Sequence, residues 1–286
     1  MRKIIDIHVH TFPDKIAERA IKILSGNSHT KPFTNGTYGA LRISMAEAEI
    51  NFSVIQPVAT NPGQVININN SAIEINKLTG STGILSFGGM HPDFKNIYGE
   101  LERIYKAGII GIKLHPVYQG VNIDDERFIK ILKAASEIGL IILIHAGFDI
   151  GFPGSDEAVP KRIYNALERL ETNNFKIILA HLGGWKCWDD SIKFFAGREN
   201  IYIDTAFSID SVTPNGDGKL KDSKVLPINE FLELKNKFGA EKILFGTDSP
   251  WSSQLDQINL MKSLGLSDDE LNKILFENAS KLLNIN

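Results

Sequence analysis

The stretch Ile5-Asp6-Ile7-His8-Val9-His10 decides how the rest of the sequence is interpreted. In a β-strand, residues two apart share a face, so Asp6, His8 and His10 would point one way and the three apolar residues the other. Two imidazoles at the end of one strand can converge on a single metal ion, because imidazole nitrogen is a favoured ligand of zinc and other divalent first-row metals. The pair alone fits two hydrogen-bonded histidines equally well, so further residues must decide.

The composition is that of a water-soluble globular protein. Of 286 residues, 43% are hydrophobic and 23% are charged, and the formal net charge of −3 comes without a block of like charges. This balance argues against nucleic acid or an anionic membrane as a partner, and no apolar run approaches the roughly 20 residues of a membrane span. The single cysteine, Cys187, excludes an internal disulfide and suits a reducing compartment. We therefore expect a cytoplasmic, soluble protein.

Apolar runs alternate with helical segments along the whole chain. Runs such as 140–144 and 176–180 are apolar throughout, which is typical of parallel strands covered by helices. Strands are expected at 3–10, 53–58, 84–90, 109–114, 140–144, 176–180, 201–204 and 242–247. Eight such units predict an α/β fold, a closed (β/α)8 TIM barrel that forms one domain over residues 1–286. The rival, an open doubly wound sheet, would carry a glycine-rich phosphate turn after its first strand, and the sequence has none there.

Local signals predict where several helices begin and end. A helix is expected from Asp14 to a stop at Gly26, followed by a long loop over 26–43. Ser44 with Glu47 three residues later predicts a capping box at the start of a short helix, and Ser267 predicts the cap of the last helix. Further helices are expected over 70–78, 97–107, 124–138, 159–170, 189–195 and 229–238.

Residues that can bind metal stand where the apolar runs end. They are His8 and His10 on the first run, Lys113 and His115 on the fourth, His145 on the fifth, His181 on the sixth and Asp248 on the eighth. The C-terminal ends of the strands carry the active site of a TIM barrel. One histidine after a strand is more often a hydrogen-bonded core residue, but a set of ligand-type residues at one end of a barrel predicts a metal centre.

Several segments carry a resemblance to a known family. They are Asp-Ile-His-Val-His at 6–10, Gly-Ile-Lys-Leu-His-Pro at 111–116, Leu-Ile-His-Ala-Gly at 143–147, Leu-Ala-His-Leu-Gly-Gly at 179–184 and Leu-Phe-Gly-Thr-Asp-Ser-Pro-Trp at 244–251. With Glu277-Asn278-Ala279 near the end, the chain resembles the amidohydrolase superfamily, and within it the amidohydrolase-related group of metal-dependent hydrolases. The resemblance covers nearly the whole chain and says little about the substrate.

The resemblance implies two possible metal arrangements. In dihydroorotase-like members a carboxylated lysine bridges two metal ions, and Lys113 stands where that lysine is expected. The ligands of one ion would then be His8, His10 and Asp248, and the ligands of the other ion would be His145 and His181. The presence of Lys113 makes us lean towards this arrangement.

The second arrangement is that of aminocarboxymuconate semialdehyde decarboxylase-like members, which hold one ion. The implied ligands are His8, His10, His145 and Asp248. His181 is then a free acid/base, and Lys113 is an ordinary cation that could bind a substrate carboxylate. The sequence leaves both arrangements open, and with them the number of divalent ions per chain, for which zinc is our first choice.

The expected chemistry is hydrolysis. A bound divalent ion lowers the pKa of its water towards about 7 and polarises a carbonyl. Asp248 would act as general base and then general acid in cleaving a C–N or C–O bond of a cyclic amide, a lactone or a related ester. The alternative is a decarboxylase with one metal ion and His181 as acid/base. The intact ligand set argues against a non-catalytic scaffold, and the sequence leaves the oligomeric state open, including a homo-oligomer.

Three further residues are candidates for supporting roles. His115 follows Lys113 by two positions, so it shares the inward face of that strand and could touch substrate. Asp6 and Asp204 are carboxylates that could orient a ligand imidazole, although for Asp6 a structural hydrogen bond is equally expected. Substrate contacts are expected from the long loops at about 26–43, 147–158 and 205–227.

Overall fold

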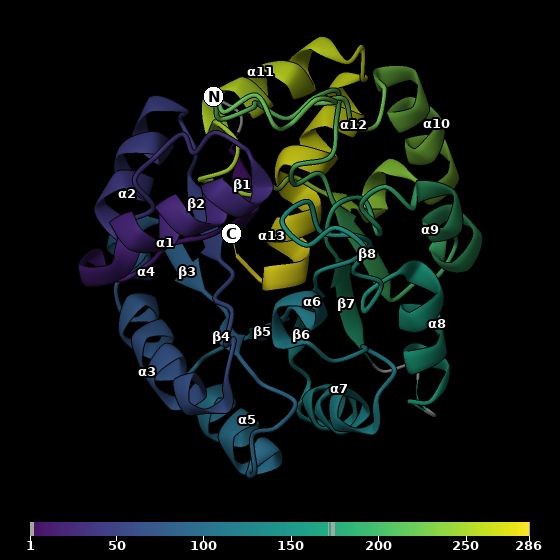
Figure 1. The fold of residues 1–286 in the computed structure, drawn as a ribbon. Helices are drawn as coiled ribbons and strands as arrows, with labels where there is room; N and C mark the ends of the chain where they lie inside the picture. Colours follow the sequence, from purple (N-terminus) through teal and green to yellow (C-terminus); the bar gives the residue numbers. More distant parts are fainter. Residues whose placement is uncertain (1–2, 171, 173–174, 286) are drawn as a thin grey trace. The chain divides into compact units, whose positions relative to one another are not determined.

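The computed structural model describes residues 3–170, 172 and 175–285 (Figure 1). The chain divides into two compact units, each described by itself. What we call the terminal unit comprises Met1–Ile55, Ile150–Pro153 and Asp204–Asn286, and the central unit comprises Gln56–Asp149 and Gly154–Ile203. The single domain expected over 1–286 stays a prediction, and its ends at 1–2 and 286 lie outside the described residues.

The terminal unit is built around a fully buried strand, β1 (Ile5–Val9). This strand pairs in parallel with β2 (Phe52–Ile55). On its other side it meets the segment that follows β9 (Ile243–Leu244): Ile7 N donates to Phe245 O at 2.9 Å, and Asp248 N donates to His8 O at 2.8 Å. The histidine-bearing end of β1 therefore lies beside Asp248.

Helices of the terminal unit follow or precede these strands. They are α1 (Asp14–Ser28), α2 (Tyr38–Glu47), α10 (Ile228–Phe238), α11 (Gln254–Ser263), α12 (Asp268–Asn272) and α13 (Asn278–Leu283), with a 3-10 turn at Ala240–Lys242 and a π-helical turn at Lys273–Glu277. The cap predicted at Ser267 is confirmed, because Glu270 N donates to the Ser267 hydroxyl. Ser267 N also donates to the Glu270 carboxylate, which completes a capping box.

The central unit contains a continuous run of parallel strands, joined in the order β4-β5-β6-β7-β8. Their bounds are β4 (Gly88–Gly89), β5 (Gly111–Leu114), β6 (Ile141–Ile144), β7 (Lys176–Leu179) and β8 (Ile201–Asp204), preceded in the chain by β3 (Ile84–Ser86). All residues of β5 and β6 are buried, as the uninterrupted apolar runs predict.

The helices of the central unit alternate with its strands. They are a 3-10 turn at Pro62–Gln64, α3 (Val65–Asn76), α4 (Thr79–Thr82), α5 (Ile97–Lys106), α6 (Pro116–Gln119), α7 (Glu126–Ile138), α8 (Pro160–Glu168) and α9 (Trp188–Phe195). Helices α5 and α7 pack side by side (Figure 1). In the described residues of both units, no helix is long and apolar enough to cross a membrane.

Two local predictions were wrong, and both concern the segment after β1. Helix α1 continues through Gly26 to Ser28, and His29 ends it in the left-handed conformation. Helix α2 begins at Tyr38 rather than at Ser44, because the Thr37 hydroxyl accepts a hydrogen bond from Ala40 N at 3.1 Å. Ser44 therefore lies inside a helix, and the long loop predicted over 26–43 is shorter.

A buried carboxylate fastens β1 to the segment after β9. Asp6 accepts hydrogen bonds from Thr247 N at 3.0 Å, Thr247 Oγ1 at 2.6 Å, Gln254 Nε2 at 2.8 Å and His8 N at 3.2 Å. Burial raises the pKa of Asp6 to about 7, and these hydrogen bonds oppose that rise. The role of Asp6 in this network is structural, since its bonds go to Gln254, Thr247 and the His8 backbone.

We expect Asp6→Ala to lower the free energy of unfolding by about 2–4 kcal/mol, because several buried donors lose their acceptor. Urea denaturation followed by circular dichroism measures the change. The control is Asp14→Ala, which removes an exposed carboxylate from the first turn of α1. Equal stability of the two variants would contradict the structural role of Asp6.

Candidate metal centre

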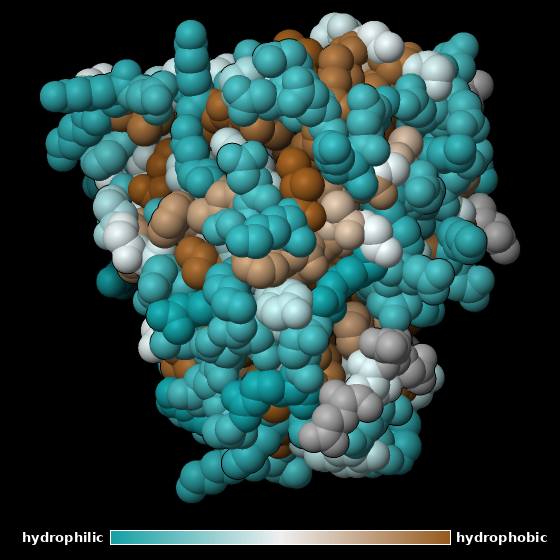
Figure 2. Space-filling view, turned by 90° about the vertical axis from the view of Figure 1, so that its right-hand side faces the viewer, coloured by the Kyte–Doolittle hydropathy of each residue, from teal (hydrophilic) through white to brown (hydrophobic). Residues whose placement is uncertain are grey.

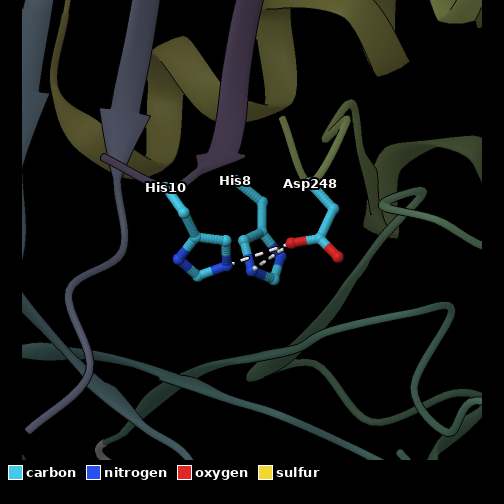
Figure 3. Close-up of side chains that lie close together, drawn as sticks. All are labelled: His8, His10 and Asp248. Carbon is cyan, nitrogen blue, oxygen red and sulfur yellow. Dashed lines mark ion pairs between the residues drawn. The ribbon is translucent and has the colours of Figure 1, made fainter. Parts of the chain in front are cut away.

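Within the described residues, two groups of metal-binding side chains have ligand atoms within 4.8 Å of one another. The first group lies in the terminal unit and consists of His8, His10 and Asp248 (Figure 3). Asp248 Oδ1 is 3.0 Å from His10 Nε2 and 3.6 Å from His8 Nε2. The two imidazole planes cross at 68° with centroids 5.1 Å apart, so both Nε2 atoms face the same carboxylate. This donor set fits a divalent first-row metal ion.

Asp204 fixes the orientation of the His8 ring. His8 Nδ1 and Asp204 Oδ2 are 2.8 Å apart, and both side chains are buried. A carboxylate beside Nδ1 favours the tautomer with its proton on Nδ1, in which the lone pair of Nε2 is available to a metal ion. The geometry thus places Asp204 where the predicted orienting carboxylate would lie, whereas Asp6 meets the backbone of His8.

Thr205, the residue after Asp204, makes hydrogen bonds to β9 and the segment that follows it. Thr205 N donates to Leu244 O at 3.1 Å, and the Thr205 hydroxyl donates to Gly246 O at 2.9 Å. A Cβ on Gly246 would lie 3.0 Å from His8 Cβ, so glycine permits the close approach of the two segments. Asp204 is 196 residues from His8 in the sequence, so only the fold shows which imidazole it contacts.

Strained backbone marks several of these positions. Asp248 has φ 61°, and His181 and Leu182 have φ 60° and 56°, all in the left-handed region. A residue other than glycine held there costs about 1–2 kcal/mol. Such strain persists where surrounding contacts over-determine the backbone, and it is concentrated at functional sites.

The second group lies in the central unit and consists of His115, His145 and Asp149, all buried. Asp149 Oδ2 is 3.7 Å from His115 Nε2 and 3.8 Å from His145 Nε2. The His115 and His145 rings are stacked, with centroids 4.1 Å apart and planes within 13°. Sequence reasoning missed Asp149, which lies in a loop rather than at a strand end. Its one signal was its position four residues after His145.

His181 and Lys113 complete the set of residues expected at the strand ends. His181 Nε2 lies 3.1 Å from His145 Nδ1, so the structure brings these two histidines into contact. Lys113 lies on β5, in register with Gly89 and Leu143, and is 1% exposed. The sequence predicts that Lys113, His145 and His181 are metal ligands. These roles stay predictions.

Loop contacts hold Asp149 in place. Gly147 N donates to Ala158 O at 2.8 Å, Phe148 N donates to Trp185 O at 3.1 Å, and Asp149 N donates to the Ser155 hydroxyl at 3.3 Å. Gly147 has φ 91°, and a Cβ there would lie 2.1 Å from Trp185 N. The loops after β6 and β7 are therefore tightly joined.

A comparison with protein families decides the assignment of the chain. A sequence model of the family described as amidohydrolase matches residues 5–285. The chain belongs to the amidohydrolase family. This membership supports metal-dependent catalysis, and the two groups of histidine and aspartate ligands agree with it. No curated protein matches the chain.

Solved structures show the same fold. An uncharacterised TIM-barrel protein from Bordetella bronchiseptica has a TM-score of 0.75 at 18% identity, with 99% of each chain covered. A dihydroxybenzoic acid decarboxylase from a Polaromonas species, with bound manganese and the inhibitor 2-nitroresorcinol, has a TM-score of 0.69 at 15% identity, covering 100% of this chain and 98% of that one.

A candidate 2-pyrone-4,6-dicarboxylic acid hydrolase from Pseudomonas putida is also similar in fold. Its TM-score is 0.66 at 15% identity, covering 100% of this chain and 98% of that one. Together the family match and these structures confirm the predicted α/β fold, a (β/α)8 TIM barrel. At such low identity the structural likeness shows the fold alone.

We expect Asp204→Asn to weaken metal binding roughly 10- to 100-fold, because the variant no longer holds the proton on His8 Nδ1. Equilibrium dialysis against Zn²⁺ measures the affinity. Asp222→Asn is the matched control, since Asp222 is exposed and lies in the same connection between β8 and α10. If both variants bind Zn²⁺ like the parent, the orienting role of Asp204 is wrong.

Substitutions of two glycines in the loop after β6 distinguish the effect of a steric clash from the effect of backbone strain. Gly147→Ala should lower the free energy of unfolding by more than about 3 kcal/mol, because its Cβ would overlap Trp185. Gly154→Ala has a similar φ of 86° but nothing within 4 Å, so we expect a loss of about 1 kcal/mol. Urea denaturation of both variants makes the comparison, and equal losses would contradict the tight loop packing.

Proposed function

We propose that this protein is a metal-dependent hydrolase that cleaves a C–N or C–O bond in a cyclic amide, a lactone or a related ester. The observation that carries the proposal is the convergence of His8 Nε2, His10 Nε2 and Asp248 Oδ1, with the other nitrogen of His8 bonded to Asp204. Such a set could bind one face of a divalent ion.

The residues that would hold the ion are His8, His10 and Asp248. When bound, a divalent ion supplies a Lewis acid that polarises a carbonyl and lowers the pKa of water. Two imidazoles and a carboxylate suit zinc, our first choice, and also manganese, which the Polaromonas decarboxylase binds. The metal specificity of this chain is part of the proposal.

Asp248 is the proposed general base and general acid. Its Oδ1 faces both imidazoles, and its second carboxylate oxygen points away from the two rings (Figure 3). In the proposed reaction Asp248 accepts a proton from the attacking water, whose oxygen bonds to the carbonyl carbon. The C–N or C–O bond then breaks, and Asp248 returns the proton to the leaving nitrogen or oxygen.

A decarboxylase is the second candidate, and observations in the central unit favour it. The Lys113 amine is buried and, when protonated, could pair with a substrate carboxylate, and His181 contacts His145 at a buried position. In this reaction the carboxylate leaves as CO₂, and His181 gives a proton to the carbon that carried it. The Polaromonas relative, a decarboxylase of dihydroxybenzoic acid, lends this candidate support.

Two further properties belong to the proposal. We propose a reducing, cytoplasmic compartment, because the sequence has one cysteine, and burial raises the pKa of the Cys187 thiol to about 11, which keeps it protonated. We propose a small molecule rather than nucleic acid or a membrane as partner. Polar residues predominate on the face drawn in Figure 2. A measurement of mass in solution would show whether the protein forms a homo-oligomer.

One assay separates the two candidate reactions. Purified protein loaded with Zn²⁺ or Mn²⁺ is offered 2-pyrone-4,6-dicarboxylic acid, simple lactones, cyclic amides and 2,6-dihydroxybenzoate. We expect ring opening, followed by ultraviolet absorbance, without release of CO₂. Asp248→Asn should lower kcat roughly 100-fold or more, while His181→Ala should matter less for hydrolysis.

Metal content measured on the same samples makes the outcome interpretable. If the Asp248→Asn variant retains its metal and full turnover, the proposed role of Asp248 is wrong. Release of CO₂ that depends on His181 would replace the hydrolase with the decarboxylase.

A further inference from the structure

We propose that Trp188 and Ser191, both on helix α9, are positioning residues for His181. They hold the backbone of the turn that carries His181, and this turn directs the His181 imidazole towards His145. All of these residues belong to the central unit. The geometry does not depend on the proposed function, whereas its effect on turnover rests on the acid/base role of His181 in the second candidate reaction.

The turn after β7 has an unfavourable backbone conformation. His181, Leu182 and Gly183 have φ values of 60°, 56° and 78°, so three successive residues are left-handed. Residues other than glycine adopt this conformation singly rather than in runs, because their Cβ comes close to the following carbonyl oxygen. Such a backbone persists only where surrounding contacts hold it. The turn over 181–183 therefore needs support from other parts of the central unit.

Helix α9 gives this support through two side chains. Trp188 Nε1 donates to His181 O at 3.2 Å, and the Ser191 hydroxyl donates to Leu182 O at 3.0 Å. The two donors are three residues apart, a spacing that places side chains on one face of a helix. One face of α9 thus bonds two successive carbonyls of the left-handed turn.

Gly183 allows α9 to come this close to the turn. A Cβ at Gly183 would lie 2.2 Å from the Ser191 hydroxyl oxygen and 3.0 Å from Ile203 Cγ2. Ser191 is completely buried, so its hydroxyl makes the bond to Leu182 O away from competing water. The glycine is required by the close approach as well as by its positive φ.

Packing fixes α9 independently of the turn. Phe195 is buried in the core, and the ring of Phe194 lies 5.0 Å from the ring of Tyr164 on α8. A helix anchored in this way can hold a strained segment beside it. The result of the arrangement is that His181 Nε2 lies 3.1 Å from His145 Nδ1.

Nuclear magnetic resonance of the histidine rings tests the proposal without an activity assay. Spectra that link ring protons to ring nitrogens are recorded on protein loaded with Zn²⁺, a d¹⁰ ion. We expect Ser191→Ala and Trp188→Phe each to shift the ring signals of His181, which are identified by their loss in His181→Gln. Ser136→Ala should leave these signals in place, and it is the matched control because Ser136 is a buried serine of α7 in the same unit.

The parent protein gives a second readout. The indole N–H signal of Trp188, identified by its loss in Trp188→Phe, should exchange with water roughly 10-fold or more slowly than that of free tryptophan, because it is bonded to His181 O. An indole N–H that exchanges as fast as in free tryptophan would show that this bond does not form in solution.

Turnover distinguishes a positioning role from a general loss of stability. In the release of CO₂, Ser191→Ala should lower kcat roughly 10-fold or more and change KM less, because the acid/base group is misplaced. The double variant His181→Ala/Ser191→Ala should be no slower than His181→Ala alone, since Ser191 acts through His181. Additive losses would contradict this.

The outcomes separate this proposal from the proposed function. Unchanged His181 ring signals in both Ser191→Ala and Trp188→Phe overturn the positioning role, whatever the activity. Shifted ring signals in a protein without turnover support the positioning role and count against the proposed function. Circular dichroism confirms that each variant is folded.

Discussion

The terminal unit depends on one buried carboxylate. Asp6 receives hydrogen bonds from the backbone and hydroxyl of Thr247 and from the amide of Gln254, and these tie β1 to the segment after β9. Removing a carboxylate from water is unfavourable, which is why burial raises the pKa of Asp6 to about 7. The donors offset that penalty, and their fixed geometry sets the distance between the His8 end of β1 and Asp248.

In each group of candidate ligands, one histidine has a neighbour beside its second ring nitrogen. Asp204 lies 2.8 Å from Nδ1 of His8, and His181 Nε2 lies 3.1 Å from Nδ1 of His145. A metal ion binds an imidazole nitrogen only through its lone pair, so the partner of the second nitrogen decides which tautomer is available. The positive φ values of Asp248 and His181 show that the backbone, too, is held in an unfavourable conformation at these positions.

The amidohydrolase fold leaves the reaction open for a physical reason. A polarising metal ion and buried acid/base side chains can serve either hydrolysis or loss of CO₂, because both reactions need charge stabilisation and a moved proton. Which one occurs depends on the substrate that the loops admit. Fold similarity at 15–18% identity does not carry that information.

The sequence by itself determined the strands and most of the ligand-type residues. Uninterrupted apolar runs such as 141–144 are typical of buried parallel strands, and a polar residue at the end of such a run stands out from its neighbours. The cap at Ser267 was predictable because the backbone group that it bonds lies three residues further along the chain.

Only the tertiary structure decided what each ligand-type residue meets. Asp204 orients His8 across 196 residues of sequence, and Asp149 joins two histidines from a loop that has no local signature. The start of α2 was mispredicted because Thr37 and Ser44 are both residue types that cap helices, and in the structure the cap is Thr37. Local patterns report propensity, while the partner of a buried polar group depends on contacts between segments far apart in the chain.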